Sequence, residues 1–140
     1  MRRIGISHLA DRSYGSISGG ELRLVLLARA LCQQTPLVLM DEPTAHLDYR
    51  NELRFLETIC ELSKTDGISV LIATHAPDQA FFFESAGCDV SALFLREGFV
   101  AAKGRPGEII TESRLEEVYG IRAKILESSG EKTILLQKSL

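Results

Sequence analysis

Two short apolar runs separated by a helix-length segment place the strongest limit on what this chain can fold into. Residues 37–41 (Leu-Val-Leu-Met-Asp) and 68–74 (Ile-Ser-Val-Leu-Ile-Ala-Thr) are typical of buried strands. Between them, residues 49–65 carry apolar side chains at helical spacing and end at an Asp-Gly pair. Because strands joined by a crossover helix pair in parallel, the pattern predicts an α/β fold built on a parallel sheet.

The segments around this unit predict further helices and a small antiparallel tail. Ser18 and Glu21 form an S-x-x-E capping box, which predicts a helix that begins there and ends before Pro36. Residues 1–17 have little periodicity and predict a loop or a short helix. The remaining expected elements are a helix over 78–86, a hairpin of 90–95 with 99–103, a helix capped by Ser113 and ended by Gly120, and a hairpin of 122–127 with 132–137.

Composition excludes several classes of function. The chain has 140 residues, 45% apolar and 25% charged, as in a globular protein with a real core. Its net charge is −3 and it has no long basic run, so it has no general electrostatic reason to bind nucleic acid or an anionic membrane. The apolar stretches are too short to span a bilayer, and the first residues do not form a signal peptide. We therefore expect neither nucleic-acid binding nor direct membrane insertion.

Three chemically useful side chains follow the two expected strands. Asp41 and Glu42 come at the end of the first strand, and His75 follows the second. Sites in parallel sheets lie at the carboxyl ends of strands, so these residues should meet at one edge. One carboxylate can hold Mg²⁺ while the other faces a water nucleophile, and the imidazole can contact a phosphate oxygen or position the water. The alternatives are a solvated acidic pair before a turn and a merely exposed histidine.

The start of the first long helix is a candidate phosphate-binding surface. Ser18, Gly19, Gly20 and Glu21 place two glycines where backbone N–H groups are unpaired and the helix dipole favours negative charge. Simple N-capping is the alternative, and the two roles are compatible. Asp48 also precedes a helix and is expected to cap it. No G-x-x-x-x-G-K-[ST] loop occurs in the sequence, so the usual phosphate cradle is missing.

Taken together, these segments resemble the ATP-binding-cassette (ABC) ATPases. The resemblance is to the family's signature motif, Walker B strand, D-loop and switch histidine, in residues 17–21 (Ile-Ser-Gly-Gly-Glu), 37–42 (Leu-Val-Leu-Met-Asp-Glu), 43–48 (Pro-Thr-Ala-His-Leu-Asp) and 74–75 (Thr-His). Ile17 and Glu21 stand where leucine and glutamine are commoner. The larger departure is that no Walker A loop, Q-loop or adenine-stacking residue is found.

The resemblance implies a role for each of these residues. Asp41 would bind Mg²⁺ through water, Glu42 would be the general base, and His75 would contact the γ-phosphate of ATP. Asp48 would link the two sites of a head-to-tail dimer. The nucleotide held by the opposite subunit would be contacted by the signature residues Ser18, Gly19, Gly20 and Glu21.

The resemblance also implies the domain organisation. The whole chain, residues 1–140, is expected to be part of a P-loop NTPase cassette, its C-terminal half. Its expected regions are a signature-helix region (1–35), an α/β core from Walker B to the switch histidine (36–88) and a C-terminal tail (89–140). The absent half should leave apolar strand faces or edges uncovered, and such surfaces promote association.

Similarities outside the catalytic motifs, which are less specific than those motifs, indicate importers of iron chelates or cobalamin. They lie in residues 18–31, 44–48, 104–111 and 115–121. The implied function is the partial ATP-binding subunit of an importer, at the cytoplasmic side of the plasma membrane, with a second ATPase subunit and a permease as partners. Without a phosphate cradle, the chain alone should not hydrolyse ATP. The alternatives are a soluble ABC ATPase that transports nothing and a non-catalytic half-domain that binds or regulates an intact partner.

Overall fold

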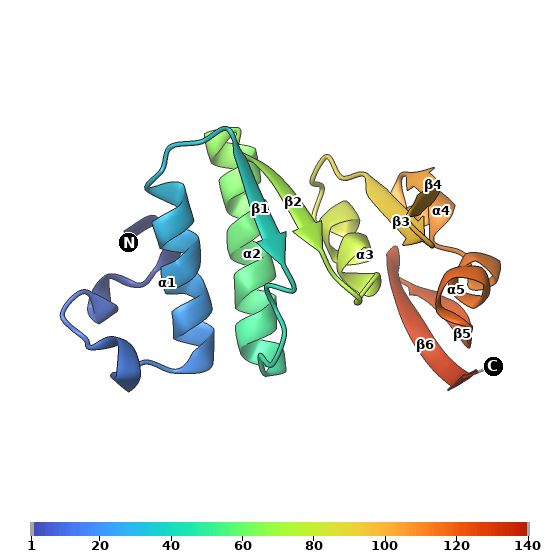
Figure 1. Ribbon diagram of the computed structural model, residues 1–140, viewed down its shortest axis with the longest axis horizontal. Coiled ribbons are helices and arrows are strands. Elements are labelled where there is room, and N and C mark those ends of the chain that lie inside the picture. The colour runs from blue at the N-terminus through green and yellow to red at the C-terminus, as the bar shows by residue number, and fades with distance from the viewer. Residues whose placement is uncertain (1, 140) are drawn as a thin grey trace. The chain divides into compact units, whose positions relative to one another are not determined.

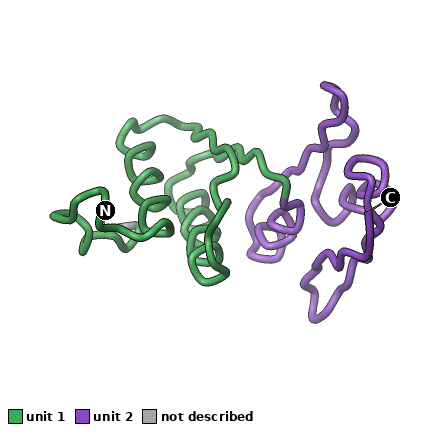
Figure 2. Tube along the Cα trace, turned by 60° about the horizontal axis from the view of Figure 1, so that its bottom comes forward, with its two compact units in different colours: residues 1–75 green, residues 76–140 purple. Residues whose placement is uncertain are grey.

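The computed structural model describes residues 2–139, and the chain divides into two compact units, Met1–His75 and Ala76–Leu140 (Figure 2). The predicted strand–helix–strand unit lies entirely in the first unit. Among the described helices, none is both long enough and apolar enough to cross a membrane.

The first unit confirms the strand–helix–strand prediction. Strand β1 (Leu37–Asp41) pairs in parallel with β2 (Ser69–Ala73), and helix α2 (Tyr49–Asp66) connects them. Helix α2 contacts both β2 and helix α1 (Gly19–Leu31) (Figure 1). Before α1 the chain forms three short 3₁₀ helices, Arg2–Ile4, Ser7–Leu9 and Tyr14–Ser16.

Local side-chain hydrogen bonds set the ends of these helices. Ser18 caps α1 in the predicted capping box with Glu21, and Asp48 caps α2 by accepting a backbone hydrogen bond from Asn51. Gly67 ends α2 in the left-handed conformation, which a residue without Cβ adopts at no steric cost. Helix α1 ends at Leu31, well before Pro36, so the proline does not define its end.

One face of the β1–β2 sheet is buried or half-buried and the other is exposed, which corrects the expectation of fully buried strands and agrees with the expectation of uncovered apolar strand faces. Val38 is 6% exposed, whereas Leu37, Leu39 and Leu71 are 48%, 68% and 62% exposed. Leu39 and Leu71 are paired in register, and residues two apart in a strand share a face, so these leucines form one apolar surface. Parallel sheets are normally covered on both faces. The sheet is therefore a partial one, with its apolar outer face open.

The described part of the second unit, residues 76–139, contains two hairpins and three helices. Its elements are α3 (Asp78–Ser85), β3 (Ala92–Arg96), β4 (Phe99–Gly104), α4 (Pro106–Ile109), α5 (Glu112–Tyr119), β5 (Ile121–Ser128) and β6 (Glu131–Ser139). Strands β3–β4 and β5–β6 pair antiparallel, as predicted. Its core is formed by the buried side chains of Phe81, Phe94, Ile110, Leu115 and Ala123.

One predicted cap in this unit is wrong. The N-cap of α5 is Thr111 rather than Ser113, and its hydroxyl accepts a hydrogen bond from the backbone N–H of Arg114 at 3.2 Å. Thr111 has the extended backbone that an N-cap requires, whereas Ser113 already lies inside the helix. Gly120 ends α5 in the left-handed conformation, as predicted.

The open sheet face leads to a prediction about association. We expect the chain to associate with itself, because burying exposed leucines removes apolar surface from water. The Leu39→Lys/Leu71→Lys double variant should shift the population towards monomer in light scattering. Leu136→Lys on β6 is a matched control, since Leu136 is 69% exposed and Leu39 is 68% exposed. A wild-type chain that stays monomeric at high concentration, or an equal effect of the control, would contradict this account.

Candidate functional site

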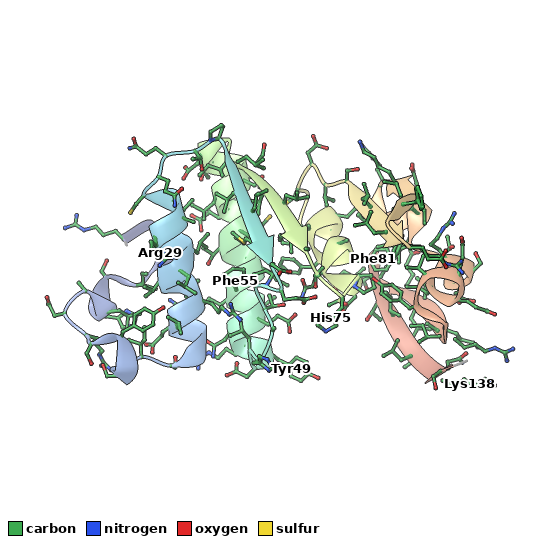
Figure 3. All side chains as sticks on the ribbon, viewed as in Figure 1. Arg29, Tyr49, Phe55, His75, Phe81 and Lys138 are labelled. Carbon is green, nitrogen blue, oxygen red and sulfur yellow. The ribbon has the colours of Figure 1, made fainter. Side chains whose placement is uncertain are left out.

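The parallel pairing brings the predicted acidic pair and histidine to one edge of the sheet. Asp41 is opposite Ala73 in the register. The backbone N–H of Glu42 then donates to the Ala73 carbonyl at 2.9 Å, which extends the pairing one residue beyond β1. His75 lies two residues beyond Ala73, the last residue of β2 (Figure 3). Asp41, Glu42 and His75 are therefore all at carboxyl strand ends, where α/β sheets place their sites.

Glu42 and His75 are in direct contact. The imidazole Nδ1 lies 2.8 Å from Glu42 Oε2, and the two side chains are 77% and 37% exposed for His75 and Glu42. An ionised carboxylate only accepts hydrogen bonds, so Nδ1 carries the proton in this contact. The contact leaves Oε1 of Glu42 and Nε2 of His75 available to other groups.

The backbone of Glu42 has a positive φ at the point where its side chain contacts His75. Glu42 has φ of +43°, a left-handed conformation that residues with a Cβ rarely adopt. Such a conformation costs on the order of 1–3 kcal/mol and persists only where the surroundings impose it. Here the hydrogen bond to Ala73 and a turn bond from the Ala45 N–H to the Glu42 carbonyl, at 3.1 Å, hold it in place. The loop thus turns sharply where the carboxylate is presented.

Asp41 is exposed on the same sheet face as Leu37 and Leu39. Its carboxylate oxygens are ligands that suit Mg²⁺, which usually takes one or two protein carboxylates and completes its shell with water and phosphate oxygens. Within residues 2–139 no cluster of three or more candidate ligands occurs that could hold a metal ion alone. The donor set therefore fits Mg²⁺ carried with a phosphate substrate.

The N-terminus of α1 is capped by a complete capping box. The Ser18 hydroxyl donates to Glu21 Oε2 at 2.8 Å and accepts from the Glu21 N–H at 3.3 Å, while the Ser18 N–H donates to Oε2 at 2.8 Å. The backbone and hydroxyl hydrogen bonds from Ser18 lower the pKa of Glu21, and nearby His8, with Nε2 3.4 Å from Oε1, adds to this effect. The hydroxyl of Ser18 is therefore already engaged within the chain.

The two glycines at this helix start have different surroundings, and packing requires only one of them to be glycine. A Cβ on Gly20 would lie 2.5 Å from Cγ of Asn51, so packing against α2 requires glycine there. A Cβ on Gly19 would meet nothing within 4 Å, and its φ is not in the left-handed region. The backbone N–H groups of Gly19 and Gly20 have no hydrogen-bond partner among residues 2–139. Nothing in the described chain therefore explains Gly19.

The predicted capping role of Asp48 is confirmed. Its partner Asn51 is a residue that the sequence did not predict. The two carboxylate oxygens of Asp48 accept from the backbone N–H and the side-chain amide of Asn51, each at 2.8 Å. The backbone hydrogen bond from Asn51 is the main cause of the lowered pKa of Asp48. Asn51 could not be found from the sequence, because its contact with Gly20 joins segments far apart in the chain.

The starts of α1 and α2 line a common surface groove. It has a volume of about 490 Å³ and is lined by Ser18, Glu21, Asp48, Arg50, Asn51 and Arg54. A slightly larger groove, about 530 Å³, lies between Leu31, Pro36 and Gly67 and contains none of the predicted site residues. Tyr49, the first residue of α2, is 92% exposed beside the Asp48 cap (Figure 3).

Comparison with known proteins gives a consistent set of likenesses. Residues 1–45 match a family model described as ABC transporter. The ferric enterobactin transport ATP-binding protein FepC of Escherichia coli (strain K12) is 36% identical, over 91% of this chain and 45% of its own length. The hemin import ATP-binding protein HmuV of Bordetella avium is 36% identical, over 97% of this chain and 53% of its own length.

Solved structures agree with these likenesses. An inward-facing putative metal-chelate type ABC transporter matches 99% of this chain and 54% of its own, with a TM-score of 0.82 and 25% identity. The ADP conformation of an ATP-binding cassette of an ABC transporter covers 84% of this chain and 46% of its own, with a TM-score of 0.73 and 29% identity. The chain thus spans about half the length of the curated relatives it matches.

The lowered pKa of Glu21 predicts an acid-sensitive helix start. A carboxyl group whose pKa is lowered by folding contributes stability above its unfolded pKa, and loses it as pH falls through the folded pKa. Glu21→Gln should therefore lower the melting temperature at pH 7. Its difference from wild type should shrink between about pH 5 and pH 3. Equal melting temperatures at pH 7, or a difference independent of pH, would contradict the assignment.

Proposed function

We infer that this chain belongs to the family of ABC transporter ATP-binding proteins, and we propose that it supplies the water-activating and signature parts of an ATPase site. It corresponds to the C-terminal half of a P-loop NTPase cassette, and under this proposal residues 1–140 form one partial nucleotide-binding domain. The observation that carries the proposal is the 2.8 Å contact between Glu42 and His75 at the ends of adjacent parallel strands. A base and an orienting imidazole in contact form an arrangement suited to activating water.

Glu42 is the proposed general base. One of its oxygens contacts His75, and the other remains available to accept a proton from water that attacks the γ-phosphate of ATP. Because Nδ1 of His75 is engaged with Glu42, Nε2 is the ring nitrogen that would contact a phosphate oxygen. The histidine would thereby hold the base and the phosphate in a fixed relation, which is the main requirement of phosphoryl transfer.

Asp41 would hold Mg²⁺ through a water molecule, beside the phosphates. When bound, the metal neutralises phosphate charge as the reaction proceeds. Asp41 is the last residue of β1 and Glu42 follows it, so the Asp41 carboxylate is held at the edge where the nucleotide would lie. Asp41 is exposed, which leaves its carboxylate open to the solvent and to a substrate.

The signature residues Ser18, Gly19, Gly20 and Glu21 would contact a nucleotide held by a second ATPase subunit. The N–H groups of Gly19 and Gly20 are the favoured donors, because a helix start binds anions and nothing in the described chain occupies them. The absence of any packing reason for Gly19 supports close approach by another molecule. A phosphate oxygen could reach the Ser18 hydroxyl only in competition with Glu21. Asp48 would link the two sites of the head-to-tail dimer.

We further propose a role in import of an iron chelate or cobalamin, with a permease holding the subunit at the cytoplasmic side of the membrane. The support is kinship rather than site geometry. Relatives include proteins described as acting in ferric enterobactin transport, hemin import and, in Halobacterium salinarum, cobalamin import. The last is 35% identical over 89% of this chain and 30% of its own length.

The activity prediction compares the chain alone with a completed cassette. Alone, the chain should release no phosphate above buffer, because the amides and lysine that hold the β- and γ-phosphates are missing. Joined to the part of FepC that this chain does not match, it should hydrolyse ATP, and Glu42→Gln should lower turnover by on the order of 10²-fold or more. His75→Ala should also reduce turnover severely.

Glu57→Gln is the matched control for that experiment, since Glu57 is an exposed glutamate on α2 away from the strand ends. It should leave turnover unchanged. Near-normal turnover in Glu42→Gln or His75→Ala would refute the assigned roles. Turnover by the isolated chain that disappears in Glu42→Gln would refute the need for a second half.

The transport prediction is tested in cells. Deleting the gene for this chain should lower the uptake of a labelled iron chelate or of cobalamin, because an importer stalls without its ATPase subunit. Restoring the gene should recover uptake, and a Glu42→Gln copy should not. Unchanged uptake of both solutes, with a defect in another solute, would overturn the substrate assignment while leaving the ATPase assignment intact.

A further inference from the structure

We propose that Asn51 is a positioning residue that couples the start of α1 to the Asp48 cap of α2. Gly20 and Asp48 lie in the two segments that, under the proposed function, act on the nucleotide of the opposite subunit, and the inference rests on that function for its consequence. The coupling itself rests only on contacts within the first unit. One asparagine side chain touches both segments.

The contact between Asn51 and Gly20 is tight. A Cβ added to Gly20 would lie 2.5 Å from Cγ, 2.8 Å from Cβ and 2.8 Å from Oδ1 of Asn51. Non-bonded carbon atoms are most stable about 3.5–4.0 Å apart, so no side chain fits at position 20 while Asn51 stays in place. Gly20 is buried at this point of contact between the two helices. The absence of a Cβ on Gly20 therefore sets how closely α1 approaches α2.

Asn51 cannot easily move away, because Asp48 holds it at two points. Its backbone N–H donates to Asp48 Oδ1 and its side-chain amide donates to Asp48 Oδ2, each at 2.8 Å. The amide bond restrains the side-chain torsion, and Cγ and Oδ1 face Gly20. A displacement of α1 towards α2 must therefore break the amide bond to Asp48 or carry Asp48 with it.

This arrangement has a consequence for the proposed ATPase. Gly20, Asn51 and Asp48 form a series of contacts. The free N–H groups of Gly19 and Gly20 lie at one end of this series, and the Asp48 carboxylate lies at the other. Contact of a phosphate with the helix start would be transmitted to Asp48 through a single side chain. Asn51 itself touches neither ATP nor water in this proposal, so it acts through Gly20 and Asp48.

The test is a compensating pair of substitutions. Gly20→Ala should lower the melting temperature of the chain by roughly 4–8 °C, because the methyl group overpacks against Asn51. Gly19→Ala is the matched control, since its methyl group would meet nothing within 4 Å. In an Asn51→Gly background the clash is removed, so Gly20→Ala should cost nothing further. An equal loss in both backgrounds, or a Gly20→Ala variant as stable as Gly19→Ala, would overturn the proposal.

A second measurement separates positioning from simple packing. The Asp48 carboxyl signal is followed by NMR titration in the Leu39→Lys/Leu71→Lys background, which keeps the sheet face polar. Gly20→Ala should raise the titration midpoint of Asp48, although it changes no group bonded to that carboxylate. Asn51→Leu, which keeps the bulk and loses the amide, should raise it as well. An Asp48 midpoint that Gly20→Ala leaves unmoved would refute the coupling.

Neither measurement needs ATP turnover, so failure of the coupling is distinguishable from failure of the proposed function. In the cassette completed with the FepC half, Asn51→Leu should lower turnover at saturating ATP with little change in KM, because the nucleotide is held mainly by the other half. A rise in KM alone would overturn the positioning role.

Discussion

The parallel pairing of β1 with β2 is the interaction on which the rest of the first unit depends. It brings together two strand ends that are separated in sequence by the whole of α2. The bond from the Glu42 N–H to the Ala73 carbonyl extends this pairing into the loop and imposes a left-handed conformation on Glu42. The carboxylate then meets His75 two residues past Ala73. A slip of one residue in this register would send Glu42 to the other side of the sheet.

The same sheet has one exposed apolar face, and the candidate site beside it is open as well. Leu37, Leu39 and Leu71 form an uncovered apolar face beside Asp41. The Glu42 and His75 side chains are correspondingly open to water, at 37% and 77% exposure. Charged groups act most strongly on a reaction in a water-excluded site. A segment that covered the apolar face would also shield Glu42 and His75 from water. The chain spans about half the length of the relatives it matches.

The two glycines of the signature segment show how one motif can combine separate requirements. Gly20 is required inside the chain, because Asn51 occupies the space of its Cβ. Gly19 has no such neighbour, and its N–H, like that of Gly20, has no hydrogen-bond partner among the described residues. From the sequence, both glycines predict the same phosphate-binding or capping role. Their difference depends on Asn51, which meets Gly20 only where helix α2 packs against helix α1.

The sequence by itself determined most of the helices and strands and several helix ends, because these depend on neighbours within a few residues. Ser18, Asp48, Gly67 and Gly120 cap helices through local bonds or local torsions, and both hairpins lie where the alternating pattern predicts them. The prediction that Ser113 caps α5 was wrong because Thr111, two residues earlier, offers an equivalent hydroxyl. Only the tertiary structure decided which face of the sheet is bare, that Glu42 takes a positive φ, and that Asn51 fills the space beside Gly20. Each of these depends on contacts between segments that the chain brings together only on folding, and no local pattern records such contacts.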